Sequence, residues 1–156
     1  MQSDFRRSAR IDAPVSLVWD EVDTLERILT KSPQFKSYRL APDGDRADVT
    51  GRLTWGPLKY EVRGVAEFGY PDRLRTSSYC VRISNFGMRY DATLTFSPAG
   101  ARETTLEYLG QLALENGRAA RLRGMFREVI EDHVHELTSR IKLRAEQRCQ
   151  AQERLG

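Results

Sequence analysis

The side chains of this sequence that could do chemistry are several phenols and one imidazole, placed on faces that are otherwise apolar. Tyr60, Tyr79, Tyr90 and Tyr108 each lie in a stretch with the two-residue period of a half-buried strand. His133 lies in the middle of the apolar stripe of a long helical segment. Buried phenols and imidazoles need hydrogen-bond partners, and a neutral imidazole can serve as a general base or a ligand contact. The pattern therefore predicts either a pocket with a few polar groups or a filled core in which these groups bond to one another, to backbone or to water.

The sequence contains none of the patterns that mark common catalytic or metal sites. It has no hydrolase elbow, no phosphate-binding glycine loop, no zinc spacing and no nucleotide fingerprint. His133 and His135 are two positions apart, so on a helix they point to different sides and do not chelate one ion. Cys80 and Cys149 lie far apart, which suggests neither a disulfide nor a metal pair. We therefore expect no metal and no cofactor.

The bulk composition is that of an ordinary globular domain. The 156 residues fit one domain, and the net charge of +3 is too small a basic excess to indicate DNA as a partner. No window approaches the roughly 20 apolar residues of a membrane span, and the first ten residues lack the apolar core of a signal peptide. We expect a cytoplasmic protein without a transmembrane segment.

Alternating hydrophobic and polar residues predict a run of antiparallel strands joined by turn-rich stretches. The strands are expected at residues 5–11, 35–40, 49–55, 60–68, 79–83, 90–96 and 106–114. Two short helices, at about residues 14–22 and 25–31, separate the first strand from the rest. Pro14 suits the first turn of one helix, and Pro33 disfavours continuation of the other.

A single long helix is predicted from about Arg118, because apolar residues then recur at helical spacing on one broad stripe. The stripe weakens beyond Leu137, where Arg140 and Arg144 occupy its centre line. We therefore place one ligand-binding domain at residues 1–143 and expect residues 144–156 to form a charged tail that is exposed or frayed.

These elements predict an α+β helix-grip architecture. A helix is about 10–12 Å wide, whereas six or seven strands spaced about 4.8 Å apart span nearly three times that width. The sheet must therefore curve around the long C-terminal helix. The space between them is either packed with large side chains or left as a pocket.

The order of elements resembles that of the START-like, polyketide cyclase/dehydrase and pollen-allergen (SRPBCC) superfamily. The stretch from Ala13 to Trp19 resembles the A-P-x-x-V-W pattern of the first helix in many members. The segment from Trp55 to Gly64 is similar to a G-P-x-K hairpin of the carbon monoxide dehydrogenase branch, which is named after the G-type subunit of that enzyme. Membrane-attached members of that branch carry an apolar C-terminal extension, which the charged tail here does not match.

The resemblance implies a ligand pocket under the helix, with Trp55, Asn85, Phe86, Met125 and Phe126 near its entrance. Together with the polar residues above, it gives the predicted ligand contacts. They are Trp55, Tyr60, Tyr79, Phe86, Tyr90, Tyr108, Met125, Phe126, Val129 and His133.

Three functions follow as hypotheses. The first is a non-catalytic binding or carrier protein that encloses an apolar small molecule such as a lipid, quinone or polyketide. The second is an enzyme similar to polyketide aromatase/cyclases, in which tyrosines and His133 move protons. The third is a module that docks on a ribosome or another protein, or forms a homodimer, through a helix rich in arginine. Acidic residues are interleaved among those arginines, a pattern that is typical of a solvated surface.

Overall fold

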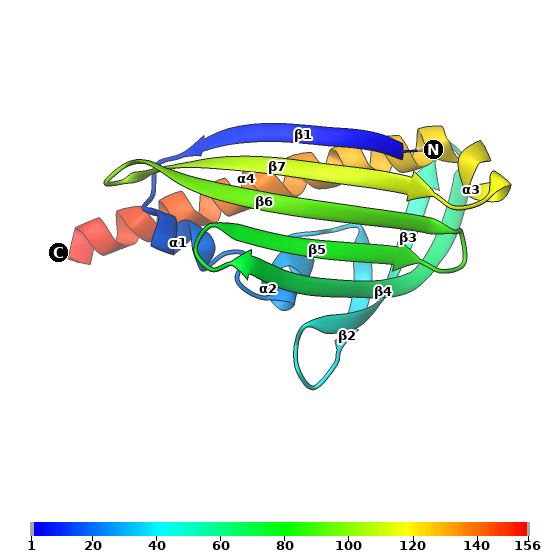
Figure 1. Ribbon diagram of the computed structural model, residues 1–156, viewed down its shortest axis with the longest axis horizontal. Coiled ribbons are helices and arrows are strands. Elements are labelled where there is room, and N and C mark those ends of the chain that lie inside the picture. The colour runs from blue at the N-terminus through cyan, green and yellow to red at the C-terminus, as the bar shows by residue number, and fades with distance from the viewer. Residues whose placement is uncertain (1, 156) are drawn as a thin grey trace.

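The protein forms one antiparallel sheet of seven strands with four helices, as the computed structural model of residues 2–155 shows (Figure 1). The description leaves out the side chains of residues 2, 3 and 55. The sheet order is β1-β7-β6-β5-β4-β3-β2, so β1 and β2 are its edges. The strands are β1 (Gln2–Ile11), β2 (Phe35–Leu40), β3 (Arg46–Trp55), β4 (Leu58–Asp72), β5 (Thr76–Ile83), β6 (Met88–Gly100) and β7 (Glu103–Leu114). The predicted helix-grip fold is confirmed.

Two short helices follow β1, as predicted, and are shorter than the sequence pattern indicates. They are α1 (Val15–Trp19) and α2 (Leu25–Leu29). Pro14 is the N-cap of α1, and the Thr24 side chain caps α2 by accepting a hydrogen bond from the Arg27 backbone N–H. Leu17, Val18 and Trp19 are buried, so α1 packs its apolar face onto the core.

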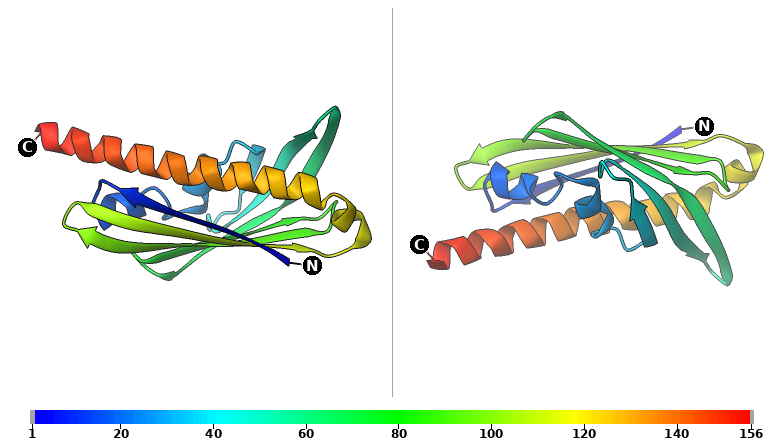
Figure 2. Two further views of the ribbon diagram at one scale, coloured as in Figure 1. Left: turned by 90° about the horizontal axis from the view of Figure 1, so that it is seen from above. Right: turned by 90° about the horizontal axis from the view of Figure 1, so that it is seen from below.

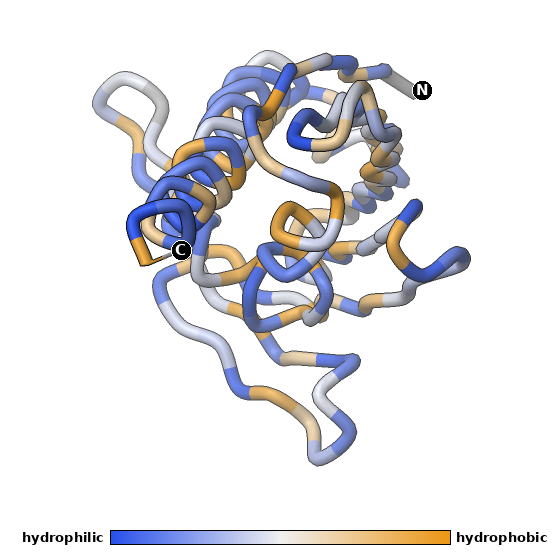
Figure 3. Tube along the Cα trace, turned by 90° about the vertical axis from the view of Figure 1, so that its left-hand side faces the viewer, coloured by the Kyte–Doolittle hydropathy of each residue, from blue (hydrophilic) through white to orange (hydrophobic). Residues whose placement is uncertain are grey.

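The sheet is strongly curved, and the long helix α4 (Arg123–Leu155) crosses its concave face (Figure 2). The β3–β4 hairpin bends away from the other strands and flanks the N-terminal half of α4. A view along α4 from its C-terminal end shows hydrophilic residues on its outer side and hydrophobic residues toward the sheet (Figure 3). The space between sheet and helix therefore lies mainly under the first half of α4.

The C-terminal helical region is two helices, which corrects the prediction of one continuous helix. A short α3 (Gly117–Arg121) precedes α4, and Asn116 caps it by accepting a hydrogen bond from the Ala119 N–H at 2.8 Å. Leu122 breaks the helix with φ −98° and ψ 14°. Its N–H bonds three residues back to Ala119, and the regular ladder resumes with Phe126 bonding to Leu122. The tightened turn redirects the chain across the sheet.

The expected exposed or frayed tail is also wrong for most of its length, because α4 continues to Leu155. Ala145 and Cys149 continue the stripe of Ile141 at four-residue spacing and are buried. Small side chains at these positions let α1 approach the helix. The Arg148 guanidinium also bonds to the buried Glu21 carboxylate at 3.0 Å. The segment is held by tertiary contacts, and its uninterrupted exposed stretch begins only at residue 150.

Candidate ligand-binding site

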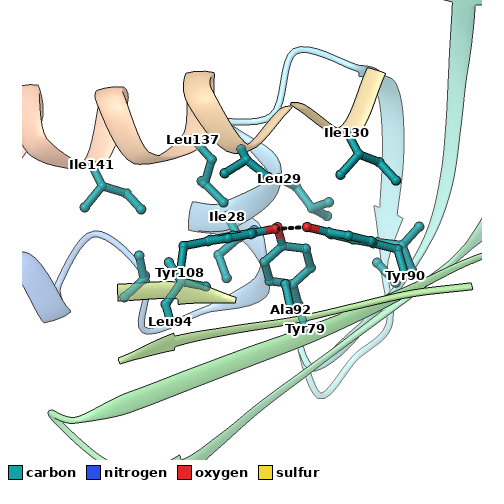
Figure 4. Packing of buried hydrophobic residues seen from close by; sticks show 14 of the residues in the cluster. Ile28, Leu29, Tyr79, Tyr90, Ala92, Leu94, Tyr108, Ile130, Leu137 and Ile141 are labelled. Atoms are coloured by element: carbon teal, nitrogen blue, oxygen red, sulfur yellow. Dashed lines mark hydrogen bonds between the residues drawn. The ribbon is translucent and has the colours of Figure 1, made fainter. Parts of the chain in front are cut away.

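Three tyrosines and His133 form one continuous chain of hydrogen bonds in the core, between the sheet and α4. The Tyr79 hydroxyl lies 2.8 Å from the Tyr108 hydroxyl and 2.6 Å from His133 Nε2. The Tyr90 hydroxyl lies 2.5 Å from that of Tyr108. The hydroxyls of Tyr90 and Tyr108 converge above the sheet (Figure 4). The sequence alternative in which these groups bond to one another is the one that the structure contains.

Small residues on the sheet make room for the three rings. Tyr79 pairs across the sheet with Ala92, and Ala92 pairs with Gly110. A Cβ atom at Gly110 would lie 1.9 Å from the Tyr90 hydroxyl oxygen and 2.6 Å from its Cζ. Gly110 is therefore required where it is, because the Tyr90 ring rests on its backbone.

The chain continues on the other side of the imidazole to Gln34, whose Oε1 lies 3.4 Å from His133 Nδ1. With Oε1 as acceptor, Nδ1 carries the imidazole proton and Nε2 accepts from the Tyr79 hydroxyl. Tyr108 then donates to Tyr79, and Tyr90 donates to Tyr108. Every hydroxyl and imidazole proton is used within the chain, so none is left over for another acceptor.

Burial keeps all four groups neutral. It lowers the pKa of His133 from 6.5 to about 4 and raises the pKa of Tyr90. It also raises the pKa values of Tyr79 and Tyr108 well above the ordinary value for tyrosine. An imidazole with such a low pKa is a weak base, which disfavours proton abstraction by His133 near neutral pH.

Beside this chain is an apolar cavity of about 60 Å³, which opens between α4 and the β2–β3 region. Its lining residues are Gln34, Phe35, Leu53, Val62, Val81, Ile83, Met88, Tyr90, Phe126, Val129, Ile130 and His133. Gln34, Phe35 and Val129 are the members that solvent partly reaches. Almost none of the wall is made of polar atoms, since the hydroxyls and the imidazole face one another instead. The cavity is suited to a hydrocarbon group and offers few polar contacts.

The ten predicted contacts divide according to their distance from this cavity. Four of them line it, namely Tyr90, Phe126, Val129 and His133. Tyr79 and Tyr108 lie behind the wall and hold Tyr90 and His133 through the hydrogen bonds described above.

The remaining four predicted contacts do not line the cavity or cannot be placed. Phe86 is buried beyond it and packs edge-on against both Phe126 and Tyr60, at centroid distances of 6.1 and 5.7 Å. Met125 is fully buried without reaching the wall. The side chain of Trp55 is outside the described part of the structure.

The end of the molecule where the resemblance placed an entrance is closed in the structure. The Asn85 side chain donates to the Glu61 carbonyl and accepts from the Arg63 N–H, which ties the β5–β6 turn to β4. Arg118 covers Phe86, with its Cζ 4.8 Å from the ring centroid. The cavity opens at Gln34, Phe35 and Val129 instead.

Sequence reasoning missed Gln34, Phe35 and Met88 as lining residues. Gln34 follows Pro33 in a short loop, and nothing in the local pattern distinguishes it from other surface amides. One signal was present: Gly51 has no side chain, and a Cβ there would lie 2.5 Å from the Gln34 carbonyl. The glycine lets this loop approach β3 and brings Gln34 to His133.

Among residues 2–155, no group of three or more potential metal ligands comes together. No helix in that range combines the length and hydrophobicity that crossing a bilayer requires. Cys80 and Cys149 are free thiols.

Comparison with known proteins gives the family. The model of the family "Polyketide cyclase / dehydrase and lipid transport" matches residues 2–146. The chain belongs to this family. The family is broader than the carbon monoxide dehydrogenase branch that the β3–β4 hairpin resembles. No curated protein matches the chain.

Members of the START-like fold are found among similar solved structures. A conserved protein from Geobacillus kaustophilus has a TM-score of 0.74 and 13% identity, covering 94% of this chain and 96% of its own. The Zhui aromatase/cyclase from a Streptomyces species has a TM-score of 0.72 and 13% identity, covering 95% and 96%. A START superfamily protein from Mycobacterium smegmatis has a TM-score of 0.64 and 12% identity, covering 92% and 97%. At these identities the likeness establishes the fold alone.

Proposed function

We propose that this protein is a non-catalytic binding or carrier protein that encloses an apolar small molecule, of lipid, quinone or polyketide type, between the sheet and α4. The observation that carries the proposal is the apolar wall of the cavity, from which the neighbouring polar groups are turned away. The membership of a family that includes lipid transport supports it.

The size of the cavity limits what enters without a rearrangement. A volume of about 60 Å³ admits a group of a few carbon atoms, whereas a whole drug-sized molecule needs roughly 300 Å³ or more. A larger ligand has to displace side chains at the wall, and Met88 and Phe126 have the most volume to move. Burying about 150 Å² of apolar ligand surface contributes about 4 kcal/mol before the entropy cost of association is subtracted. We therefore expect weak binding of fragments and tighter binding of longer apolar molecules.

Toluene is a suitable probe, because it is apolar and has no hydrogen-bonding group. We expect saturable shifts of the ¹³C-methyl NMR signals of the lining residues, Val62 and Val81 among them. Val62→Phe should fill the cavity and abolish these shifts. Val65→Phe is the matched control, because Val65 lies on the same strand but is outside the lining of the cavity. Equal shifts in the two variants, or no saturable shift in the unmodified protein, would contradict the proposal.

A catalytic function similar to that of aromatase/cyclases is the second candidate. The tyrosine–histidine chain favours it, because it would connect a ligand near Tyr90 to His133 and Gln34 by four hydrogen bonds. Such an enzyme should lose turnover of a polyketide substrate in Tyr79→Phe while keeping toluene binding. Equal turnover in the variant and the unmodified protein would exclude this role for the chain.

A further inference from the structure

A second cleft lies on the other side of α4, between that helix and the edge strand β1. It has a volume of about 360 Å³ and is lined by polar and charged residues from both elements. Its lining residues are Asp4, Phe5, Arg6, Arg7, Arg127, Glu131, Val134 and His135. α4 packs against β1 along this side of the sheet (Figure 2). None of these residues lines the apolar cavity, so the two sites are separate.

Arg7 has a buried nitrogen that lacks a hydrogen-bond partner within the described part of the chain, its Nε. Arg7 Nη1 donates to His135 Nδ1 at 2.9 Å, which leaves the edge formed by Nε and the other terminal nitrogen for a different acceptor. A buried donor without a partner is uncommon in native proteins and points to an ion or water at that place. The Nε edge of a guanidinium is the edge that binds carboxylates and phosphates with two parallel hydrogen bonds.

Further donors from α4 line the same cleft. The Arg127 guanidinium lies over the Phe5 ring, with Cζ 5.6 Å from the centroid. Its ion pair with Glu131 is long, at 3.7 Å, and both side chains are largely exposed. Such a pair contributes little and competes weakly with a bound ion. Because His135 Nδ1 accepts from Arg7, the neutral imidazole carries its proton on Nε2 and adds one more donor.

From these contacts we infer that the β1–α4 cleft binds a tetrahedral oxyanion, such as a phosphate group, between Arg7, Arg127 and His135. An anion is a stronger acceptor for Arg7 than the neutral imidazole that it now contacts. The carboxylates of Asp4 and Glu131 also line the cleft and keep the affinity moderate. The inference is independent of the proposed carrier function.

Sulfate is the probe for the site, because it stays doubly charged over the pH range used, whereas a phosphate group titrates near pH 6. The assay is a ¹H–¹⁵N NMR titration at constant ionic strength, with chloride replaced by sulfate. We expect saturable shifts at β1 and at the His135 ring. Arg7→Gln should weaken binding about tenfold or more, as expected for loss of a charge-assisted hydrogen bond. Arg7→Lys, which keeps the charge without the fork, should weaken it by a smaller factor.

Arg10→Gln is the matched control. Arg10 lies on the same strand, is 68% exposed and pairs with Glu103 outside the cleft. It should change the sulfate affinity by less than about twofold, as expected for an exposed charge. Equal weakening by Arg7→Gln and Arg10→Gln would mean that only diffuse positive charge attracts the anion, and the inference would be overturned. Absence of saturable shifts in the unmodified protein would overturn it as well.

The pH dependence supplies a second readout. A protonated imidazole cannot accept from Arg7, and the two cations are then held together best by an anion between them. The other charged groups lining the cleft beside His135 are Asp4 and Arg6 from β1 and Arg127 and Glu131 from α4. Imidazoles gain charge as the pH falls from about 8 to 5. We expect sulfate to bind more tightly at pH 5.5 than at pH 8, and His135→Gln to remove most of this difference. An affinity that does not change with pH would exclude His135 from the site.

Two further ligands distinguish the source of the anion. Inorganic phosphate and glycerol 3-phosphate are titrated at pH 8, where both are mainly doubly charged. Comparable affinities would show that the cleft accepts a phosphate group carried by a larger molecule. Binding of inorganic phosphate alone would identify the free ion as the ligand, and binding of neither would contradict the inference.

Discussion

The buried imidazole of His133 makes the stability of this protein depend on pH in a specific way. Its pKa is about 4 in the folded protein and about 6.5 in the unfolded chain, because burial penalises the charged form. On acidification the unfolded chain therefore takes up the proton first. The contribution of neutral His133 to stability is fully present above pH 6.5 and is lost as the pH falls from 6.5 toward 4.

The magnitude follows from the difference between the two pKa values. A difference of 6.5 − 4 at 1.36 kcal/mol per pH unit gives a loss of about 3 kcal/mol at pH 4 and below. A domain of this size is typically stable by about 5–15 kcal/mol, so the loss is a large part of the total.

Urea unfolding at several pH values between 7.5 and 4 measures this loss. The unmodified protein should lose about 3 kcal/mol more over this range than His133→Gln, whose amide does not titrate there. His135→Gln is the control, because His135 is exposed and should leave the pH dependence nearly unchanged. Parallel stability curves for the unmodified protein and His133→Gln would refute the reasoning, because they would show that His133 is not held neutral by burial.

Three further predictions concern the hydrogen-bonded chain and its supports. Tyr79→Phe removes the middle of the chain and orphans two buried groups, so urea unfolding should show a loss of about 2–3 kcal/mol, against about 1 kcal/mol or less for Tyr90→Phe at its end. Gly110→Ala pushes against the Tyr90 ring and should destabilise the fold by about 1–3 kcal/mol, and its cost should shrink in the double variant with Tyr90→Ala. Full additivity in this cycle would show that the two residues do not touch. Arg148→Ala breaks the bond to a buried carboxylate and should speed amide hydrogen exchange in the last turns of α4, whereas Arg154→Ala, in the exposed final turn, should not.

Much of the fold could be predicted from the sequence because the sheet alternates so regularly. Inner-face residues such as Leu94 and Leu106 are separated by polar residues along each strand, and the two-residue period fixes which face is buried. The long apolar stripe of α4 then identifies the element that covers the concave face. Short connections between the strands indicate the antiparallel order.

The errors come from contacts between residues that are distant in the sequence. The pattern predicts a tail at the end of α4 because Ala145 and Cys149 are small, and their burial against α1 has no local signature. The ion pairs that hold this segment join residues 127 or 128 positions apart. The break at Leu122 depends on where α3 packs, and helix propensity around it gives little warning.

The candidate site was predicted in part for the same reason. Alternation placed Tyr79, Tyr90 and Tyr108 on the buried face, and the helical period placed His133 opposite them. Whether their polar groups would face a cavity or one another depends on ring orientation, which Gly110 controls through its missing side chain. The sequence does not encode that choice in any local pattern.

The central claim is that the apolar cavity holds an apolar molecule. The most direct test denatures the purified protein, extracts it with organic solvent and quantifies the extract by mass spectrometry, in parallel for the unmodified protein, Val62→Phe and Val65→Phe. We expect one apolar compound, close to one molecule per chain, in the unmodified protein and in Val65→Phe, and its loss in Val62→Phe. An extract without such a compound, or equal amounts in all three proteins, would contradict the claim.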